Sequence, residues 1–228
     1  MRSMTSRFLA GVAVLALGVA GAQGQEAKKK GGPNVDRKSA ETSPEVQAVD
    51  TMLAADTLAR HALARRDPLT LIAAAKVKKE LGAQALKAKG DAETPDKPDA
   101  RAPDALLARA RELAKDRKDL LALADDVAKA GARGAVDGPK ERYTVVRSMR
   151  TATFEIPFEG GRPAAVAITG DAASRLDLYV FDENKRPICA QEGPGDQAAC
   201  RWTPIRTAVF FIQVKNYGIA NAYRIWTN

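Results

Sequence analysis

A hairpin pattern at residues 176–190, LDLYVFDENKRPICA, constrains the fold more than any other stretch of the chain. Leucine or valine occupies every second position of residues 176–181, a polar turn follows at residues 182–185, and a second apolar run starts at Pro187. Alternation with a period of two on both sides of a polar turn is typical of a β-hairpin with one face in a core. We therefore expect the sequence around it to form a sheet that pairs with it.

Short extended runs separated by Gly, Pro and Asn turns fill the chain after Gly138-Pro139. The predicted strands are residues 142–148, 151–157, 164–169, 176–181, 187–191, 198–202, 207–216 and 222–227. Many short strands at this spacing indicate an antiparallel β-sandwich over residues 140–228. The predicted inward side chains are Phe154, Ile156, Phe158, Val166, Ile168, Phe210, Ile212 and Val214.

The preceding residues 43–134 are rich in alanine and show helical periodicity instead. Start signals occur at Ser43-Pro44, Asp67-Pro68 and Ala102-Pro103, where a capping side chain or a proline suits the first turn. They predict helices over about 43–66, 67–87 and 102–130, the last of which the charged residues 116–119 would split, with a linker at 90–103. The chain is thus predicted to be α+β, with a helical bundle followed by an antiparallel β-sandwich. The bundle should be only marginally stable alone and should pack on the sheet or on a second copy.

The first 22 residues carry two arginines, an apolar run from Phe8 to Val19, and then Ala20-Gly21-Ala22. This order predicts a cleaved signal peptide. An uncleaved anchor is the alternative, but the run falls short of the roughly 20 residues that cross a bilayer. Residues 23–42 lack a hydrophobic period and predict a disordered tether. We expect a periplasmic or extracellular protein without a transmembrane segment after cleavage.

Cys189 and Cys200 are the two cysteines of the chain. In an oxidising compartment an even number of cysteines favours pairing, so we expect a disulfide that joins two neighbouring strands. A metal site is disfavoured, because the two thiolates and the distant His61 cannot supply a tetrahedral ligand set.

The formal net charge is +8, and loss of Arg2 and Arg7 with the signal would leave +6. Basic residues are interspersed with acids along the helices, which predicts a solvated surface rather than a specific nucleic-acid site. We expect a protein or an envelope polymer as partner.

Oxygen-bearing side chains are densest around the hairpin. They are Asp171, Asp177, Asp182, Glu183 and Asn184. They could bind calcium, or they could accept hydrogen bonds from the N–H groups of turns, which is the commoner role of aspartates at strand ends. No catalytic residue or cofactor site is predicted, since His61 is the only histidine and lies next to arginines on a helix.

Aromatic side chains lie on the second face of the predicted strands. They are Tyr179, Phe181, Phe211, Tyr217 and Trp226. They either form an exposed interface or lie under the helices.

Residues 164–228 resemble the bacterial pre-peptidase C-terminal domain. The shared features are the strand ending at Gly170-Asp171, the DLYVFD strand at 177–182, the Trp202-Thr203-Pro204 corner and the final strand YRIWTN. The resemblance implies a jelly-roll-like sandwich with an accessory role in secreted proteins. Two departures stand out, because no peptidase precedes the domain and Lys185 replaces the glycine of the usual turn.

We therefore expect a secreted, non-enzymatic binding or accessory protein of the cell envelope. Two alternatives remain open: a calcium-stabilised adhesion or matrix-binding protein, and a periplasmic adaptor that docks a partner through its helices.

Overall fold

The computed structural model describes residues 31–36, 42–91, 93–130 and 138–228. The predicted signal peptide and most of the predicted tether lie outside these residues. The described residues from Pro33 onward form one compact unit. No helix among them is long and apolar enough to cross a membrane.

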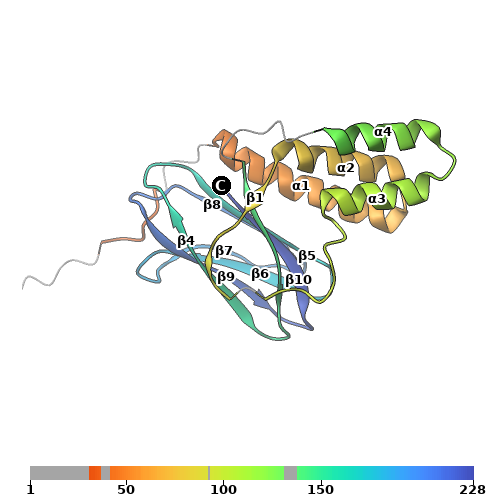
Figure 1. Cartoon of the computed structure of the whole chain (residues 1–228). Coiled ribbons are helices and arrows are strands. Elements are labelled where there is room, and N and C mark those ends of the chain that lie inside the picture. The colour runs from red at the N-terminus through yellow and green to blue at the C-terminus, as the bar shows by residue number, and fades with distance from the viewer. Residues whose placement is uncertain (1–30, 37–41, 92, 131–137) are drawn as a thin grey trace, which may run out of the picture. The chain divides into compact units, whose positions relative to one another are not determined.

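The β part consists of two five-stranded sheets that pack face to face (Figure 1). Sheet A has the order β1-β3-β10-β5-β8, and sheet B has the order β2-β4-β9-β6-β7. The strands are β1 Gln84–Ala85, β2 Lys89–Gly90, β3 Lys140–Val146, β4 Thr151–Phe158, β5 Ala164–Gly170, β6 Leu176–Phe181, β7 Pro187–Gln191, β8 Gln197–Trp202, β9 Ala208–Asn216 and β10 Asn221–Thr227.

Strand pairing follows a nested order. β3 pairs with β10, β4 with β9, β5 with β8 and β6 with β7, all antiparallel. A long hairpin rolled up so that its pairs alternate between two sheets is a jelly roll. The predicted fold class is confirmed, and each predicted strand boundary lies within two residues of the observed one.

The core between the sheets contains all the side chains predicted to face inward. Trp202 anchors one end of this core, where its ring lies 4.8 Å from the ring of Phe158 and 5.5 Å from that of Phe210. Edge-to-face and tilted ring pairs of this kind add to the stability gained from buried area alone.

Sequence reasoning missed β1 and β2, which occupy residues assigned to the end of the second helix and to the linker. The prediction of a helix to residue 87 was wrong, because Gly82 adopts a left-handed φ of 57° and stops the helix. The chain then adds one short strand to each sheet. At Gly90, with φ 137°, a Cβ atom would lie 2.0 Å from the carbonyl oxygen of Thr153, so only glycine fits there.

The described helices are α1 Pro44–Arg65, α2 Pro68–Leu81, α3 Pro103–Ala114 and α4 Lys118–Lys129. α1, α2 and α3 each begin with a proline, and Ser43 and Asp67 cap the first two by accepting hydrogen bonds from first-turn N–H groups. The predicted split of the third helix is confirmed: the chain breaks between α3 and α4, where Lys115 has a φ of 44°.

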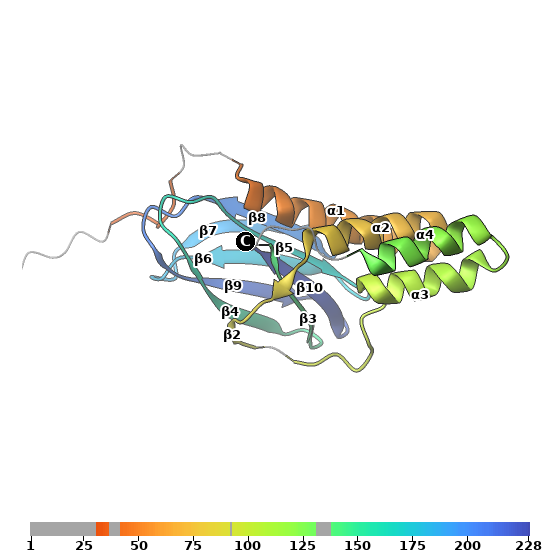
Figure 2. The same cartoon turned by 45° about the horizontal axis from the view of Figure 1, so that its top comes forward.

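α1 packs on the outer side of sheet A (Figure 2). Val46, Val49 and Met52 contact a strip of sheet A made of Ala165, Ala167 and Trp226, and the small alanines allow the helix to approach closely. α2, α3 and α4 pack on one another and on the end of α1 through a second, alanine-rich core. The helical part therefore packs on sheet A through α1, and β5 is buried on both of its faces.

Residues 33–36 depart from the predicted tether. Asn34 is fully buried, and its side-chain oxygen accepts hydrogen bonds from the N–H groups of Ile205 and Arg206. Val35 packs against the core, and Asp36 donates its N–H to the carbonyl oxygen of Thr203. This short stretch is therefore part of the sandwich, a role that its polar, glycine-containing surroundings did not indicate.

Candidate binding face on sheet B

The outer side of sheet B carries four aromatic rings: Tyr179, Phe181, Phe211 and Tyr217. We call these residues the aromatic face. Alternate side chains of β6 and β9 point to opposite sides of the sheet, so Tyr179, Phe181 and Phe211 face outward while their neighbours enter the core. Tyr217 follows directly after β9. All four rings are partly buried.

The rings form a continuous surface because the strand register brings them together. Phe181 lies opposite Phe211 on the neighbouring strand, and the rings of Tyr179 and Phe181 stack with centroids 6.4 Å apart. Apolar residues extend the surface to both sides, with Pro187 opposite Phe181 and Pro157 opposite Val209. Val209 is 40% exposed, so the apolar surface reaches solvent.

Cationic side chains lie on these rings. The ammonium group of Lys185 lies over the ring of Phe211. Lys215 and Arg175 each lie 4.6 Å from the ring centroid of Tyr217. Lysine and arginine stems can cover an aromatic surface and still swing aside when a partner arrives.

An ion pair between Arg175 and a buried carboxylate fixes one end of the aromatic face. Arg175 donates two hydrogen bonds to Asp177, at 2.8 and 2.7 Å, and Asp177 is fully buried. Burial alone would raise the pKa of Asp177, but the hydrogen bonds from Arg175 and from the N–H of Gly193 outweigh it and hold the pKa below its usual range. The carboxylate therefore stays charged and keeps the arginine in place.

Tyr179 is held at the same end of the face. Its hydroxyl donates to Glu192 at 2.8 Å and lies 3.5 Å from the hydroxyl of Tyr217. The hydrogen bond with Tyr217 and burial raise the pKa of Tyr179, so the phenol remains a neutral donor at physiological pH. Both tyrosine rings are thereby pinned in fixed positions.

The five predicted oxygen ligands do not converge on one point. Asp182 accepts hydrogen bonds from the N–H groups of Asn184 and Arg186, and Asp171 accepts one from Ala173. Glu183 pairs with Arg206, as Asp177 does with Arg175. Asp171 and Asp182 therefore cap turns, whereas Asp177 and Glu183 form ion pairs. In the described part of the chain, no group of three or more His, Cys, Asp or Glu side chains could hold a metal ion.

Lys185 itself adopts the left-handed conformation, with a φ of 62°. The N–H of Lys185 donates to the carbonyl oxygen of Asp182, and the N–H of Asp182 donates to that of Arg186, so the turn needs a left-handed residue at this position. A lysine there also supplies the cation that lies over Phe211.

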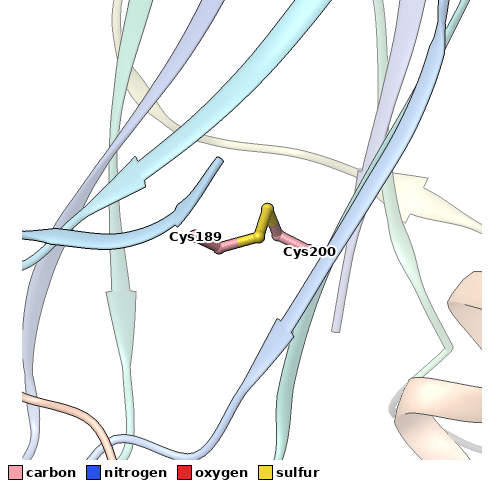
Figure 3. Close-up of a disulfide and its surroundings, with 2 residues drawn as sticks. All are labelled: Cys189 and Cys200. Atoms are coloured by element: carbon pink, nitrogen blue, oxygen red, sulfur yellow. A yellow bond between two sulfur atoms is a disulfide. The ribbon is translucent and has the colours of Figure 1, made fainter. Parts of the chain in front are cut away.

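The predicted disulfide between Cys189 and Cys200 is present, with the two Cα atoms 6.0 Å apart (Figure 3). Its two strands belong to different sheets, because β7 is an edge of sheet B and β8 is an edge of sheet A. The expectation of a bond between neighbouring strands therefore needs correction. The bond joins the two layers of the sandwich along one side.

Trp226 and His61 complete the residues singled out from the sequence. Trp226 lies under α1 on sheet A and is fully buried, so the predicted outer aromatics divide between a covered and an uncovered sheet. The alternation pattern could not distinguish the two sheets. His61 is exposed on α1, as the sequence indicated.

No family model and no curated protein matches the chain. The resemblance to the pre-peptidase C-terminal domain therefore stays a prediction beyond the sandwich fold itself. The solved structures that are similar include PliG of Aeromonas hydrophila, a periplasmic inhibitor of g-type lysozyme, at 13% identity and a TM-score of 0.31, covering 40% of this chain and 84% of that one.

Two further solved structures are similar over parts of their length. TmCBM61, solved with β-1,4-galactotriose, has 15% identity and a TM-score of 0.25, covering 38% of this chain and 69% of that one. The glucuronidase BtGH115A has 11% identity and a TM-score of 0.25, covering 82% of this chain and 34% of that one. Likenesses this low do not carry function from one protein to another.

Proposed function

We propose that this chain is a secreted, non-enzymatic binding protein of the cell envelope that holds a protein partner on the aromatic face. The contrast between the two sheets carries this proposal. The helices lie on the side of sheet A, where they bury Trp226, whereas no helix of the described residues covers the rings of sheet B (Figures 1 and 2). A continuous apolar surface left open in this way marks an interaction site.

The composition of the surface favours a protein over a polysaccharide as the partner. Its centre is apolar, with Phe181, Phe211 and Val209 next to two prolines, and its rim is charged, with Lys185, Lys215 and Glu155. An apolar centre rich in aromatic rings inside a polar rim is the usual anatomy of a protein interface. The pinned tyrosines reduce the conformational entropy that binding would cost.

The location outside the cytoplasm is supported by the disulfide, since such bonds persist in oxidising compartments. The predicted signal peptide points the same way. The pre-peptidase C-terminal resemblance implies an accessory role, which fits a module that binds a partner.

An anionic envelope polymer is the second candidate partner, and one observation favours it. Lys185, Lys215 and Arg175 lie against the rings, so a sugar acid that stacked on a ring would meet a cation beside it.

Site-specific photo-crosslinking distinguishes these partners. A photoreactive phenylalanine analogue is placed at position 181 or 211 of the full-length protein in the cells that produce it. The proposal predicts that both positions capture the same envelope protein. The control position is Leu69, which is 53% exposed on α2 and distant from sheet B, and it should capture none of that protein.

Capture of the same protein equally well from position 69 would place the interaction on the helices and support the adaptor alternative. Retention of the wild-type protein by isolated envelope polysaccharide, lost when Lys185 and Lys215 are both changed to Gln, would favour the polymer instead.

A further inference from the structure

A second candidate site lies on the opposite sheet, beyond the area that α1 covers. The loop of residues 93–101, which leads from β2 toward α3, crosses the outer side of sheet A and encloses a cavity of about 420 Å³. Tyr143, Ala222 and Arg224 form its floor, and Pro95 and Pro98 of the loop contribute to its wall. A cavity of this size is typical of small-molecule sites.

Arg224 gives the cavity its chemical character. The residue is fully buried, and its guanidinium Nε and Nη1 make no hydrogen bond to another described residue. Its charge is met by looser ion pairs, at 3.4 Å with Asp56 and 3.4 Å with Glu141, and by a pair with Asp99. The ring of Tyr143 lies 5.2 Å away. Because Nε and Nη1 are held only by these long pairs and Nη2 is held by a residue of the loop, the guanidinium can offer two parallel hydrogen bonds to another carboxylate once Asp99 moves aside.

The surroundings of Arg224 carry an excess of buried positive charge. The side chains of Lys78, Arg101 and Arg224 are at most 8% exposed, and the only carboxylate buried to the same degree among their ion-pair partners is Asp56. Asp56 is shared, since it pairs with Lys78 at 2.7 Å and with Arg101 at 3.1 Å.

Asp99 and Glu141 balance the remaining charge from the edge of the cluster, with side chains 18% and 23% exposed. Burial raises the pKa of Glu141. Asp99 differs from Glu141 because it belongs to the covering loop and not to the sheet. Its carboxylate also accepts a local hydrogen bond from the N–H of Arg101 at 2.8 Å.

We propose that this cavity binds a small organic carboxylate with an apolar body. The carboxylate of the ligand pairs with Arg224 in the place that Asp99 holds in this structure. The apolar body packs against Tyr143, Val145 and the two prolines of the loop. Glu93 at the mouth does not repel the ligand strongly, because Arg147 neutralises it at 2.6 Å.

Thermal unfolding of the full-length mature protein tests this site with phenylacetate and with its neutral analogue phenylacetamide. Phenylacetate at millimolar concentrations should raise the unfolding midpoint as mass action requires, whereas phenylacetamide should leave it unchanged. Asp99→Asn removes the competing carboxylate, so phenylacetate should bind this variant more tightly, on the order of tenfold.

Ala222→Leu is the matched control, because it fills the floor of the cavity and leaves Arg224 with its ion pairs. This variant should unfold near the wild-type midpoint and lose the response to phenylacetate. The proposal is overturned if phenylacetate shifts neither the wild type nor Asp99→Asn, if phenylacetamide shifts them equally, or if the response survives in Ala222→Leu. An Arg224 variant is unsuitable, since it would take away the cation with which Asp99 pairs and would disturb the buried cluster itself.

Discussion

Asn34 donates its backbone N–H to the carboxylate of Asp182 at 3.1 Å, across 148 residues of sequence. Its side-chain amide also donates to Glu183 and to the carbonyl oxygen of Arg206. The acidic turn that the sequence offered as a calcium site is thus held to the neighbouring corner by an asparagine from the start of the chain.

Asn34→Ala should therefore destabilise the sandwich. It removes the buried side chain that accepts from the partly buried N–H groups of Ile205 and Arg206, and the expected loss is about 1 to 3 kcal/mol of unfolding free energy. Urea denaturation measures it. Asn184→Ala, in the hairpin turn that Asn34 contacts, is the control. Asn184 is exposed, so this substitution should cost below about 1 kcal/mol. Equal losses for the two variants would mean that Asn34 is no anchor.

Calcium should not stabilise the protein. The carboxylates of the hairpin already accept hydrogen bonds from turn N–H groups or pair with Arg175 and Arg206, so a cation would have to displace those partners. Unfolding midpoints in calcium and in chelator should coincide. A midpoint that rises with calcium concentration would restore the adhesion alternative.

Loss of the disulfide should loosen the two sheets along one side. The bond joins residues 11 apart in sequence, and replacing both Cys189 and Cys200 with Ala should cost about 2 to 3 kcal/mol. Denaturant unfolding gives the loss. Amide exchange in β7 and β8 should rise more than in β3 and β10, and a uniform rise would contradict a local clamp.

Asp177 should make stability depend on acid pH. Its pKa is lower in the folded protein than in the unfolded chain, where it is about 4, so its contribution is present above about pH 4 and is lost as the pH falls through the folded pKa. Wild-type stability measured from pH 6 downward should fall more steeply in this window than that of Asp177→Asn. Parallel curves would show that the Arg175 pair contributes nothing.

The elements of the fold that could be predicted from the sequence are those with a local sequence pattern. Residues 176–191 were placed at the observed boundaries because alternation and a polar turn are both local signals. β1 and β2 have two residues each, and their pairing with distant β3 and β4 leaves no periodicity to detect. Burial on both faces of β5 likewise erased the alternation that would have shown where α1 docks.

The candidate sites were harder to predict from the sequence than the fold, because tertiary contacts create them. The four rings of the aromatic face were identified from alternation, but Trp226 was grouped with them because two sheets with opposite coverings look alike in sequence. Arg224 gave no signal at all, since its burial arises from α1, the 93–101 loop and the sheet together.

The affinity of the purified partner captured at positions 181 and 211 tests the central claim most directly. Titration calorimetry should show binding at least about tenfold weaker for Phe181→Ala and for Phe211→Ala, since buried aromatic side chains dominate interface energies. Leu69→Ala should bind as the wild type does, and the unfolding midpoints should show that all three variants are folded. Unchanged affinity in both phenylalanine variants would contradict the account.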